Sequence, residues 1–173
     1  LVMTEGGMGG EVDVRRKEQS RSAKRLKPRE MLWGGYQDTL LTPNMNRMVH
    51  DIETVLKKIA PDFIFVHYED DTHQDHRALA KATVSATRYV RNVIFYEGPT
   101  TQNFAPTLFV DIRETIEDKF AMLLAHRSQV RKTNIEGLSI TDVVRSTAVF
   151  RGIQGRVPFA EAFVPLRLFI NVG

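Results

Sequence analysis

The stretch Phe63-Ile-Phe-Val-His-Tyr-Glu-Asp-Asp-Thr-His-Gln-Asp-His76 decides how this chain can fold. It opens with four apolar residues whose β-branched and aromatic content is typical of a buried strand, and the turn pair Pro61-Asp62 precedes them. The residues after Tyr68 turn abruptly polar. We therefore expect a parallel strand over 63–68 that ends at an acidic loop.

The polar part of this stretch predicts the start of a helix. Thr72 and Asp75 have the Ser/Thr-x-x-acid spacing of a capping box, which makes Thr72 the expected N-cap of a helix over 73–90. His73 and His76 then share one helix face, and the positive end of the helix dipole favours their neutral form. Neutral imidazoles beside carboxylates indicate a metal site, and the alternative is a solvated acidic loop whose histidines have no such role.

The rest of the chain alternates between strand and helix patterns. Helices are expected over 14–27, 42–59, 114–130 and 140–150, and further strands over 31–33, 93–96, 108–112 and 163–170. Such alternation predicts an α/β fold of the Rossmann-like three-layer α/β/α type with a mostly parallel sheet. Ligands bind at the carboxyl ends of the strands in such sheets, which is where the histidine cluster falls.

Composition limits the remaining possibilities. The chain has 173 residues, 42% of them hydrophobic, which is enough for one domain with a real core. The absence of cysteine excludes disulfides and thiolate metal sites, so any metal must bind nitrogen and oxygen ligands. No apolar run approaches the roughly 18 residues of a membrane span, and we expect a cytoplasmic protein.

Several blocks of the chain resemble one known family. The histidine stretch is similar to the second signature of the LmbE-like (PIG-L-type) N-acetylglucosaminyl deacetylases. Further blocks in the family's order are Arg15-Arg-Lys-Glu18, Gly35-Tyr-Gln-Asp38, Phe95-Tyr-Glu-Gly-Pro99, Phe109-Val-Asp-Ile112, His126-Arg-Ser-Gln129 and Ala160-Glu-Ala-Phe163. The resemblance implies a zinc-dependent hydrolase that removes the N-acetyl group from an N-acetylglucosamine-type sugar or glycoconjugate. It also implies a homo-oligomer, a trimer or hexamer.

Two features depart from the family's pattern. The family's first motif, of the type His-Pro-Asp-Asp-Glu, is not in the sequence. We therefore expect that residues 1–173 form a single deacetylase domain that is incomplete at its N-terminus, without its first strand and helix. Because that motif supplies two zinc ligands and the catalytic base in the family, we expect these residues alone to bind zinc poorly and to be inactive. The second departure, Gln74 in place of proline, is mild because a good helix former suits a first turn.

The resemblance assigns roles to individual residues. His76 is the expected zinc ligand, and His73 is the group that stabilises the oxyanion or protonates the leaving amine. Asp75 is a catalytic candidate as a partner of a histidine, with a purely structural role as the alternative. The candidates for substrate binding are Arg15, Asp38, Asp71 and His126. For these residues the alternatives are ordinary surface charge, a solvated loop, and a histidine that only complements a helix end.

Two other functions stay open on the sequence alone. A metal-free, non-catalytic relative that acts as an oligomeric or binding protein would fit the missing first motif. The basic helix over 15–29 could bind nucleic acid or another polyanion, since it holds eight of the 24 basic residues. Against nucleic acid, that helix has no interleaved aromatic residues and the net charge is only +3, so we expect no nucleic-acid partner.

Overall fold

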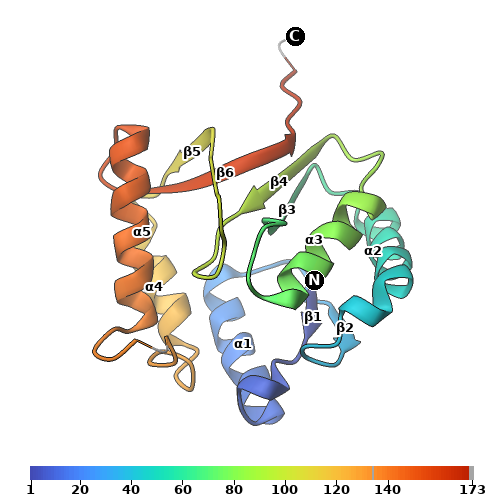
Figure 1. The fold of residues 1–173 in the computed structure, drawn as a ribbon, viewed down its shortest axis with the longest axis horizontal. Helices are drawn as coiled ribbons and strands as arrows, with labels where there is room; N and C mark the ends of the chain where they lie inside the picture. Colours follow the sequence, from blue (N-terminus) through green and yellow to red (C-terminus); the bar gives the residue numbers. More distant parts are fainter. Residues whose placement is uncertain (134, 172–173) are drawn as a thin grey trace. The chain divides into compact units, whose positions relative to one another are not determined.

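The computed structural model describes residues 1–133 and 135–171, and Figure 1 traces their elements along the chain. The chain forms two compact units. Unit 1 contains residues 1–38 and 110–161, and unit 2 contains residues 39–109 and those from 162 onward. Each unit thus combines segments that are far apart in the sequence.

Unit 1 holds a short parallel strand pair and three helices. Its elements are β1 (Val2–Thr4), a 3₁₀ turn (Gly7–Gly9), α1 (Val12–Leu26), β2 (Trp33–Tyr36), α4 (Ile116–Leu124) and α5 (Ile140–Gly155). β1 pairs with β2 in parallel, and α1 packs against α4. The core between α4 and α5 contains Ile116, Phe120 and Ala148. A capping box at Ser139 and Asp142 begins α5.

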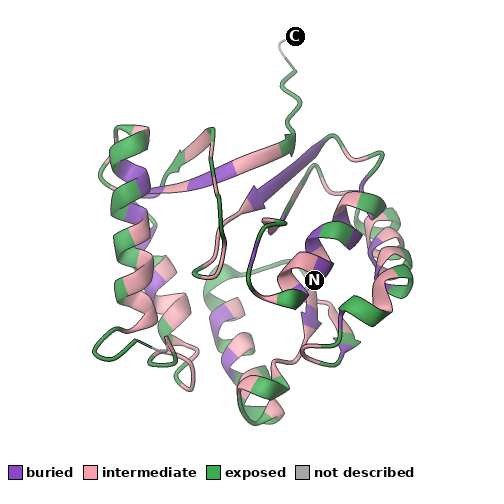
Figure 2. Ribbon diagram, in the orientation of Figure 1, coloured by how far each residue is buried: buried purple, intermediate pink, exposed green. Residues whose placement is uncertain are grey.

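Unit 2 is built on a parallel strand pair covered by helices. Its elements are a 3₁₀ turn (Thr42–Asn44), α2 (Met45–Ile59), β3 (Phe63–His67), α3 (Gln74–Ala86) and β4 (Asn92–Tyr96). These two strands belong to a sheet of order β3-β4-β6-β5, with β5 at Leu108–Asp111 and β6 at Ala160–Arg167; β5 and β6 each have residues in both units. β4 is buried over most of its length (Figure 2), and its Phe95 forms a core cluster with Val66 and Ala80. The parallel register places His67 opposite Tyr96 at the carboxyl ends of β3 and β4.

The expected Rossmann-like α/β class with a mostly parallel sheet is confirmed. One correction concerns β6, which pairs with β4 antiparallel. Two helices are shorter than predicted: α3 ends at Ala86 because Thr87 and Val90 form a turn, and α4 ends at Leu124 in a similar turn at His126. No helix in residues 1–133 and 135–171 is both long and apolar enough to cross a membrane.

Candidate active site

α3 begins with a histidine as its cap. His73 has extended backbone angles, φ −78° and ψ 116°, and its Nδ1 accepts a hydrogen bond from the Asp75 amide at 3.2 Å. The prediction that Thr72 is the N-cap is therefore wrong. A neutral imidazole that accepts through Nδ1 carries its proton on Nε2. His73 therefore offers an Nε2–H donor.

His76 has the opposite arrangement. Its Nδ1 lies 3.1 Å from Oδ2 of Asp71, a carboxylate that is only 3% exposed. Burial acts to raise the pKa of Asp71, but hydrogen bonds from the His73 amide and the His76 ring outweigh it, and the pKa falls to about 2. An ionised Asp71 can only accept, so Nδ1 of His76 carries the proton and Nε2 keeps its lone pair. His76 therefore offers an Nε2 that can bind a metal.

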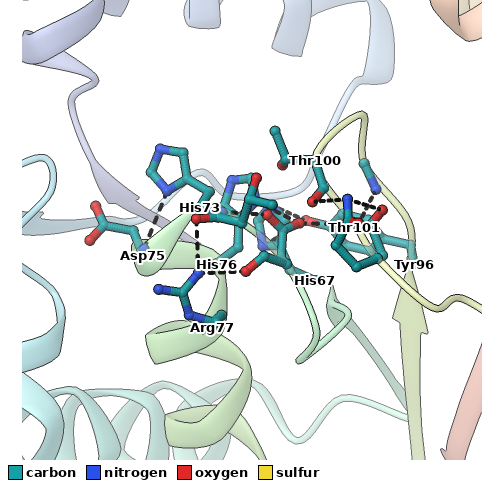
Figure 3. A network of polar contacts seen from close by, with 12 residues as sticks. His67, His73, Asp75, His76, Arg77, Tyr96, Thr100 and Thr101 are labelled. Atoms are coloured by element: carbon teal, nitrogen blue, oxygen red, sulfur yellow. Dashed lines mark hydrogen bonds and ion pairs between the residues drawn. The ribbon is translucent and has the colours of Figure 1, made fainter.

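Three imidazole rings stack at this site, as Figure 3 shows. The centroid of His76 lies 3.8 Å from that of His67 and 4.4 Å from that of His73. Burial lowers the pKa of His76, and burial together with the charge of His76 lowers that of His67 to about 4. The hydroxyl of Tyr96 lies 3.2 Å from Nε2 of His67, and burial raises the pKa of Tyr96 to about 12. Both lowered pKa values favour the neutral form of His67 and of His76.

The loop before α3 is held by backbone contacts. Asp71 and Thr101 form an antiparallel bridge, and the Thr101 hydroxyl donates to Oδ2 of Asp71 at 3.0 Å. The Thr72 amide donates to the Thr100 carbonyl, and Arg77 donates to the carbonyls of residues 71 and 72 (Figure 3). The alternative of a solvated loop is thus excluded for Asp71, which is buried. These contacts favour a role for Asp71 in orienting His76, and its contact with substrate stays a prediction.

The carboxylate of Asp75 is also buried, at 5% exposed, but it faces a different segment. Its Oδ2 accepts from the Thr39 amide at 2.7 Å, and its Oδ1 accepts from the Leu41 amide at 3.2 Å. Asp75 therefore joins the start of α3 to the segment that follows Asp38. This contact gives Asp75 a structural role, and its catalytic role stays a prediction.

In unit 1 a buried glutamate joins two of the sequence blocks. Glu18 on α1 is 2% exposed, and its carboxylate accepts from the amide and the hydroxyl of Ser128, each at 2.7 Å. Arg15 forms an ion pair with Glu18 at 3.6 Å. Burial and the charge of Arg15 lower the pKa of His126. The predicted substrate residues Arg15 and His126 thus lie beside the same carboxylate.

The glycine-rich loop of unit 1, residues 5–10, lies against Arg15 and Gln129. Gly6 has φ +66°, a conformation that other residues rarely adopt, and a Cβ there would lie 3.1 Å from Nε of Arg15, so a substitution would be strained and crowded. The Met8 amide donates to Oδ2 of Asp38 at 3.1 Å, and Nε2 of Gln129 donates to the Gly9 carbonyl at 3.0 Å. Nε and Nη1 of Arg15 are buried without a hydrogen-bond acceptor in the described part of the chain. The guanidinium of Arg15 can therefore still donate hydrogen bonds to a ligand beside this loop.

The predicted site residues therefore gather in two places. Unit 2 brings together Asp71, His73, Asp75 and His76, and unit 1 holds Arg15, Asp38 and His126. In residues 1–133 and 135–171 no group of three or more histidines, aspartates and glutamates is arranged to hold a metal ion. The described residues thus supply one well-prepared nitrogen donor, Nε2 of His76, rather than a complete metal site.

The sequence reasoning missed several residues that shape the two places. His67 lies in the predicted strand over 63–68 and contacts Tyr96, but its stacking on His76 was not foreseen. The sequence held a signal for Glu18 and Ser128, because both stand inside blocks that resemble the family. Nothing local pointed to Thr101, which contacts Asp71 across 30 residues.

Comparisons with known proteins identify one family of similar proteins. The PIG-L family model, described as GlcNAc-PI de-N-acetylase, matches residues 1–87. The chain is 30% identical over 136 residues to the uncharacterized deacetylase YaiS of Escherichia coli K12, an alignment that covers 74% of each protein. The matched residues of the family model include the histidine stretch.

Two solved structures share the fold. The conserved protein TT1542 of Thermus thermophilus superimposes with a TM-score of 0.84 at 26% identity, over 98% of this chain and 81% of that one. The N,N'-diacetylchitobiose deacetylase of Pyrococcus horikoshii gives 0.79 at 24% identity, over 95% and 70% of the two chains. The family match, the curated relative and the histidine site together show that this chain belongs to the PIG-L (LmbE-like) family of deacetylases.

Proposed function

We propose that this chain carries the catalytic histidines of a zinc-dependent hydrolase that removes the acetyl group from N-acetylglucosamine-type sugars or glycoconjugates. The observation that carries the proposal is the pair of opposite tautomers at the start of α3. Asp71 leaves Nε2 of His76 free to bind a metal, while the Asp75 amide leaves Nε2–H of His73 free to donate.

The two tautomers suit amide hydrolysis. Attack on an acetamide carbonyl creates negative charge on its oxygen, and a fixed N–H donor stabilises that charge. His73 can supply this donor or pass a proton to the leaving amine. We propose His76 as one ligand of a divalent metal, which is zinc by resemblance to the family. Residues 1–133 and 135–171 contain no group of three or more histidines, aspartates and glutamates that could supply the complete ligand set. Asp71 would then fix the ring orientation of His76.

Recognition of the sugar is proposed for unit 1. Among the described residues, the buried Nε of Arg15 has no hydrogen-bond acceptor and its Nη1 forms only the ion pair with Glu18 at 3.6 Å. Sugar hydroxyls and acetamide oxygens are acceptors that such N–H groups can bind. Asp38 and His126 add an acceptor and a ring nitrogen that suit hydroxyl donors. Similarity to the GlcNAc-PI de-N-acetylase family and to an N,N'-diacetylchitobiose deacetylase supports an N-acetylated amino sugar as the substrate class.

Acetate release from N-acetylglucosamine and N,N'-diacetylchitobiose tests the proposal. We would assay both residues 1–173 and the longest natural polypeptide that contains them. We expect His76→Ala to abolish zinc retention and acetate release. His73→Ala should keep zinc and lose roughly 10²–10³-fold in kcat, the usual cost of one oxyanion donor.

The matched control is His50→Ala, because His50 is exposed on α2 and should leave activity unchanged. Zinc binding without acetate release from any N-acetyl sugar would contradict the deacetylase and favour a binding protein. Acetate release that survives His76→Ala would contradict the metal role of His76.

We also propose a cytoplasmic homo-oligomer, a trimer or hexamer, on the resemblance alone. Light scattering on the purified protein measures the assembly, and a monomer at micromolar concentration would contradict it. Nucleic acid is not favoured as a partner, since several basic residues of α1 already form ion pairs: Arg15 with Glu18, Arg16 with Glu5, and Arg25 with Asp118.

A further inference from the structure

Arg77 places a positive charge in the first turn of α3. The helix begins at Gln74, so the guanidinium belongs to the end where the backbone dipole is itself positive. A cation is disfavoured at that end of a helix, whereas the carboxylate of Asp75 in the same turn is favoured. Acceptors outside the helix must therefore offset the cost of placing a guanidinium at this position.

The loop before α3 supplies those acceptors. Nη1 of Arg77 donates to the carbonyl of Asp71 at 2.5 Å and to the carbonyl of Thr72 at 2.8 Å, and Figure 3 shows both bonds. Hydrogen bonds from a charged donor are about twice as strong as those between neutral groups. One bond would leave the loop free to turn about it, but bonds to two consecutive carbonyls fix the direction of the peptide group between them.

That peptide group follows directly on the carboxylate that contacts both histidines of α3. Oδ1 of Asp71 accepts from the His73 amide at 2.7 Å, and Oδ2 lies 3.1 Å from Nδ1 of His76. The carboxyl carbon of an aspartate is only two bonds from its Cα, so a rotation of the loop backbone displaces both oxygens. Both hydrogen bonds of the Arg77 guanidinium go to the loop, and Arg77 therefore reaches His76 through Asp71.

We propose that Arg77 is a positioning residue that fixes residues 71 and 72, so that Asp71 keeps the proton of His76 on Nδ1 and leaves its Nε2 open to a metal. The inference rests on the proposed function, in which His76 binds zinc. Every residue in this chain of contacts belongs to unit 2. The arrangement also explains why a cation stands at the start of α3.

Amide hydrogen exchange in chelator-treated residues 1–173 tests the contact with the loop. Arg77→Met removes the donors and keeps an apolar stem. We expect the amides of Thr72 and His73 to exchange roughly ten-fold faster, the factor that one charge-assisted hydrogen bond contributes to an opening equilibrium. The amide of Ile94, in the buried part of β4, should keep its wild-type rate, because the change is local. Lys81→Met is the matched control, since Lys81 is an exposed cation one turn later on α3.

The helix dipole makes this test decisive. If Arg77 made no useful contact with the loop, its removal would only relieve an unfavourable charge, and exchange of the Thr72 and His73 amides would stay unchanged or become slower. Either of those results would overturn the proposal. So would the same acceleration in Lys81→Met, because the effect would then come from the lost charge and not from the two hydrogen bonds.

The imidazole nitrogen NMR signals of His76 test whether the effect reaches the ring without any metal. We expect the wild type to show the form protonated on Nδ1 and Arg77→Met to add a measurable share of the form protonated on Nε2. A His76 spectrum identical to that of the wild type, together with faster exchange of the loop amides, would overturn the positioning role.

Zinc affinity of the longest natural polypeptide then tests whether Arg77 acts through Asp71. Arg77→Met should weaken zinc binding roughly ten-fold, the lower end of the cost of losing a group that orients a ligand. Added to Asp71→Asn, it should weaken binding by less than about two-fold further, because the two residues act in series. Losses that multiply would overturn this order of action. If the wild type retains no zinc, the proposed function fails, while the exchange and NMR experiments still decide whether Arg77 positions His76.

Discussion

Replacing Glu18 with glutamine should destabilise the protein at neutral pH. The carboxylate accepts two hydrogen bonds of 2.7 Å from Ser128 while being 2% exposed. Hydrogen bonds to a charged group contribute about 1.5–3 kcal/mol, against about 1 kcal/mol for neutral pairs. Glutamine at this position lowers the contribution of each hydrogen bond to that of a neutral pair. Its NH₂ group is a donor, so it cannot accept from a Ser128 donor that it faces. We therefore expect a loss of about 2–3 kcal/mol in the free energy of unfolding at pH 7.

The same contacts predict a pH dependence. Burial acts to raise the pKa of Glu18, but the bonds from Ser128 and the charge of Arg15 outweigh it, and the net pKa lies below the ordinary 4.5. A carboxyl with a depressed folded-state pKa stabilises the fold above its unfolded pKa, and this stability is lost as pH falls below about 4.5 toward the folded value. The difference between the wild type and Glu18→Gln should therefore shrink in acid.

Urea unfolding at pH 7 and at pH 4 measures both effects, provided that the m-values agree. The matched control is Glu136→Gln, an exposed glutamate of the same unit, which should change stability by less than about 0.5 kcal/mol. Equal stability of Glu18→Gln and wild type at pH 7 would refute the reasoning. So would a difference that stays constant down to pH 4, because the effect would then not come from the charge.

Three further predictions concern other contacts. Asp71→Asn should weaken zinc binding roughly 10–100-fold by releasing Nδ1 of His76, as measured by competition with a chromogenic chelator; unchanged affinity would contradict the orienting role. The pKa of His67, lowered from 6.5 to about 4, means that the unfolded chain gains a proton first as pH falls. About 3 kcal/mol of stability should then be lost between pH 6.5 and 4 in chelator-treated protein, and less in His67→Gln. Ser139→Ala should cost about 1 kcal/mol in urea unfolding by removing the capping box with Asp142, whereas an unchanged midpoint would show that the cap is dispensable.

Local pattern was enough for most of the fold. The apolar run at Phe63 is a strand, the periodic residues after Pro43 form α2, and the capping spacing correctly announced a helix near residue 73. The cap itself was misassigned, because the Asp75 carboxylate that would complete a capping box with Thr72 binds Thr39 and Leu41 instead. Sequence spacing cannot show a competing partner 36 residues away, so the pattern located the helix but not its cap.

The sequence predicted more of the histidine site of unit 2 than of the Glu18 site of unit 1. The residues of α3 and its loop are consecutive, so their types and order already suggested a histidine site. The contact between Glu18 and Ser128 spans 110 residues, and only the folded chain shows that one accepts from the other. The same limit applies to Asp71, for which the sequence left a solvated loop open, whereas the structure buries it and gives it a hydrogen bond from Thr101. Long-range partners decide which of several nearby carboxylates becomes buried.

The different roles proposed for His73 and His76 follow from the group that each Nδ1 contacts. Two histidines three residues apart on one helix have similar surroundings, and stacked rings 4.4 Å apart disfavour a second positive charge. Nδ1 of His73 faces a backbone amide, which can only donate, and Nδ1 of His76 faces an ionised carboxylate, which can only accept. His73 therefore carries its proton on Nε2 and His76 carries its proton on Nδ1, although both residues are histidines. Asp71→Asn changes the Nδ1 contact of His76 and leaves that of His73 in place, and the asparagine carbonyl oxygen can still accept from the His73 amide, which lies 2.7 Å from Oδ1 of Asp71. The donor on His73 and the lone pair on His76 should therefore prove separable by mutation.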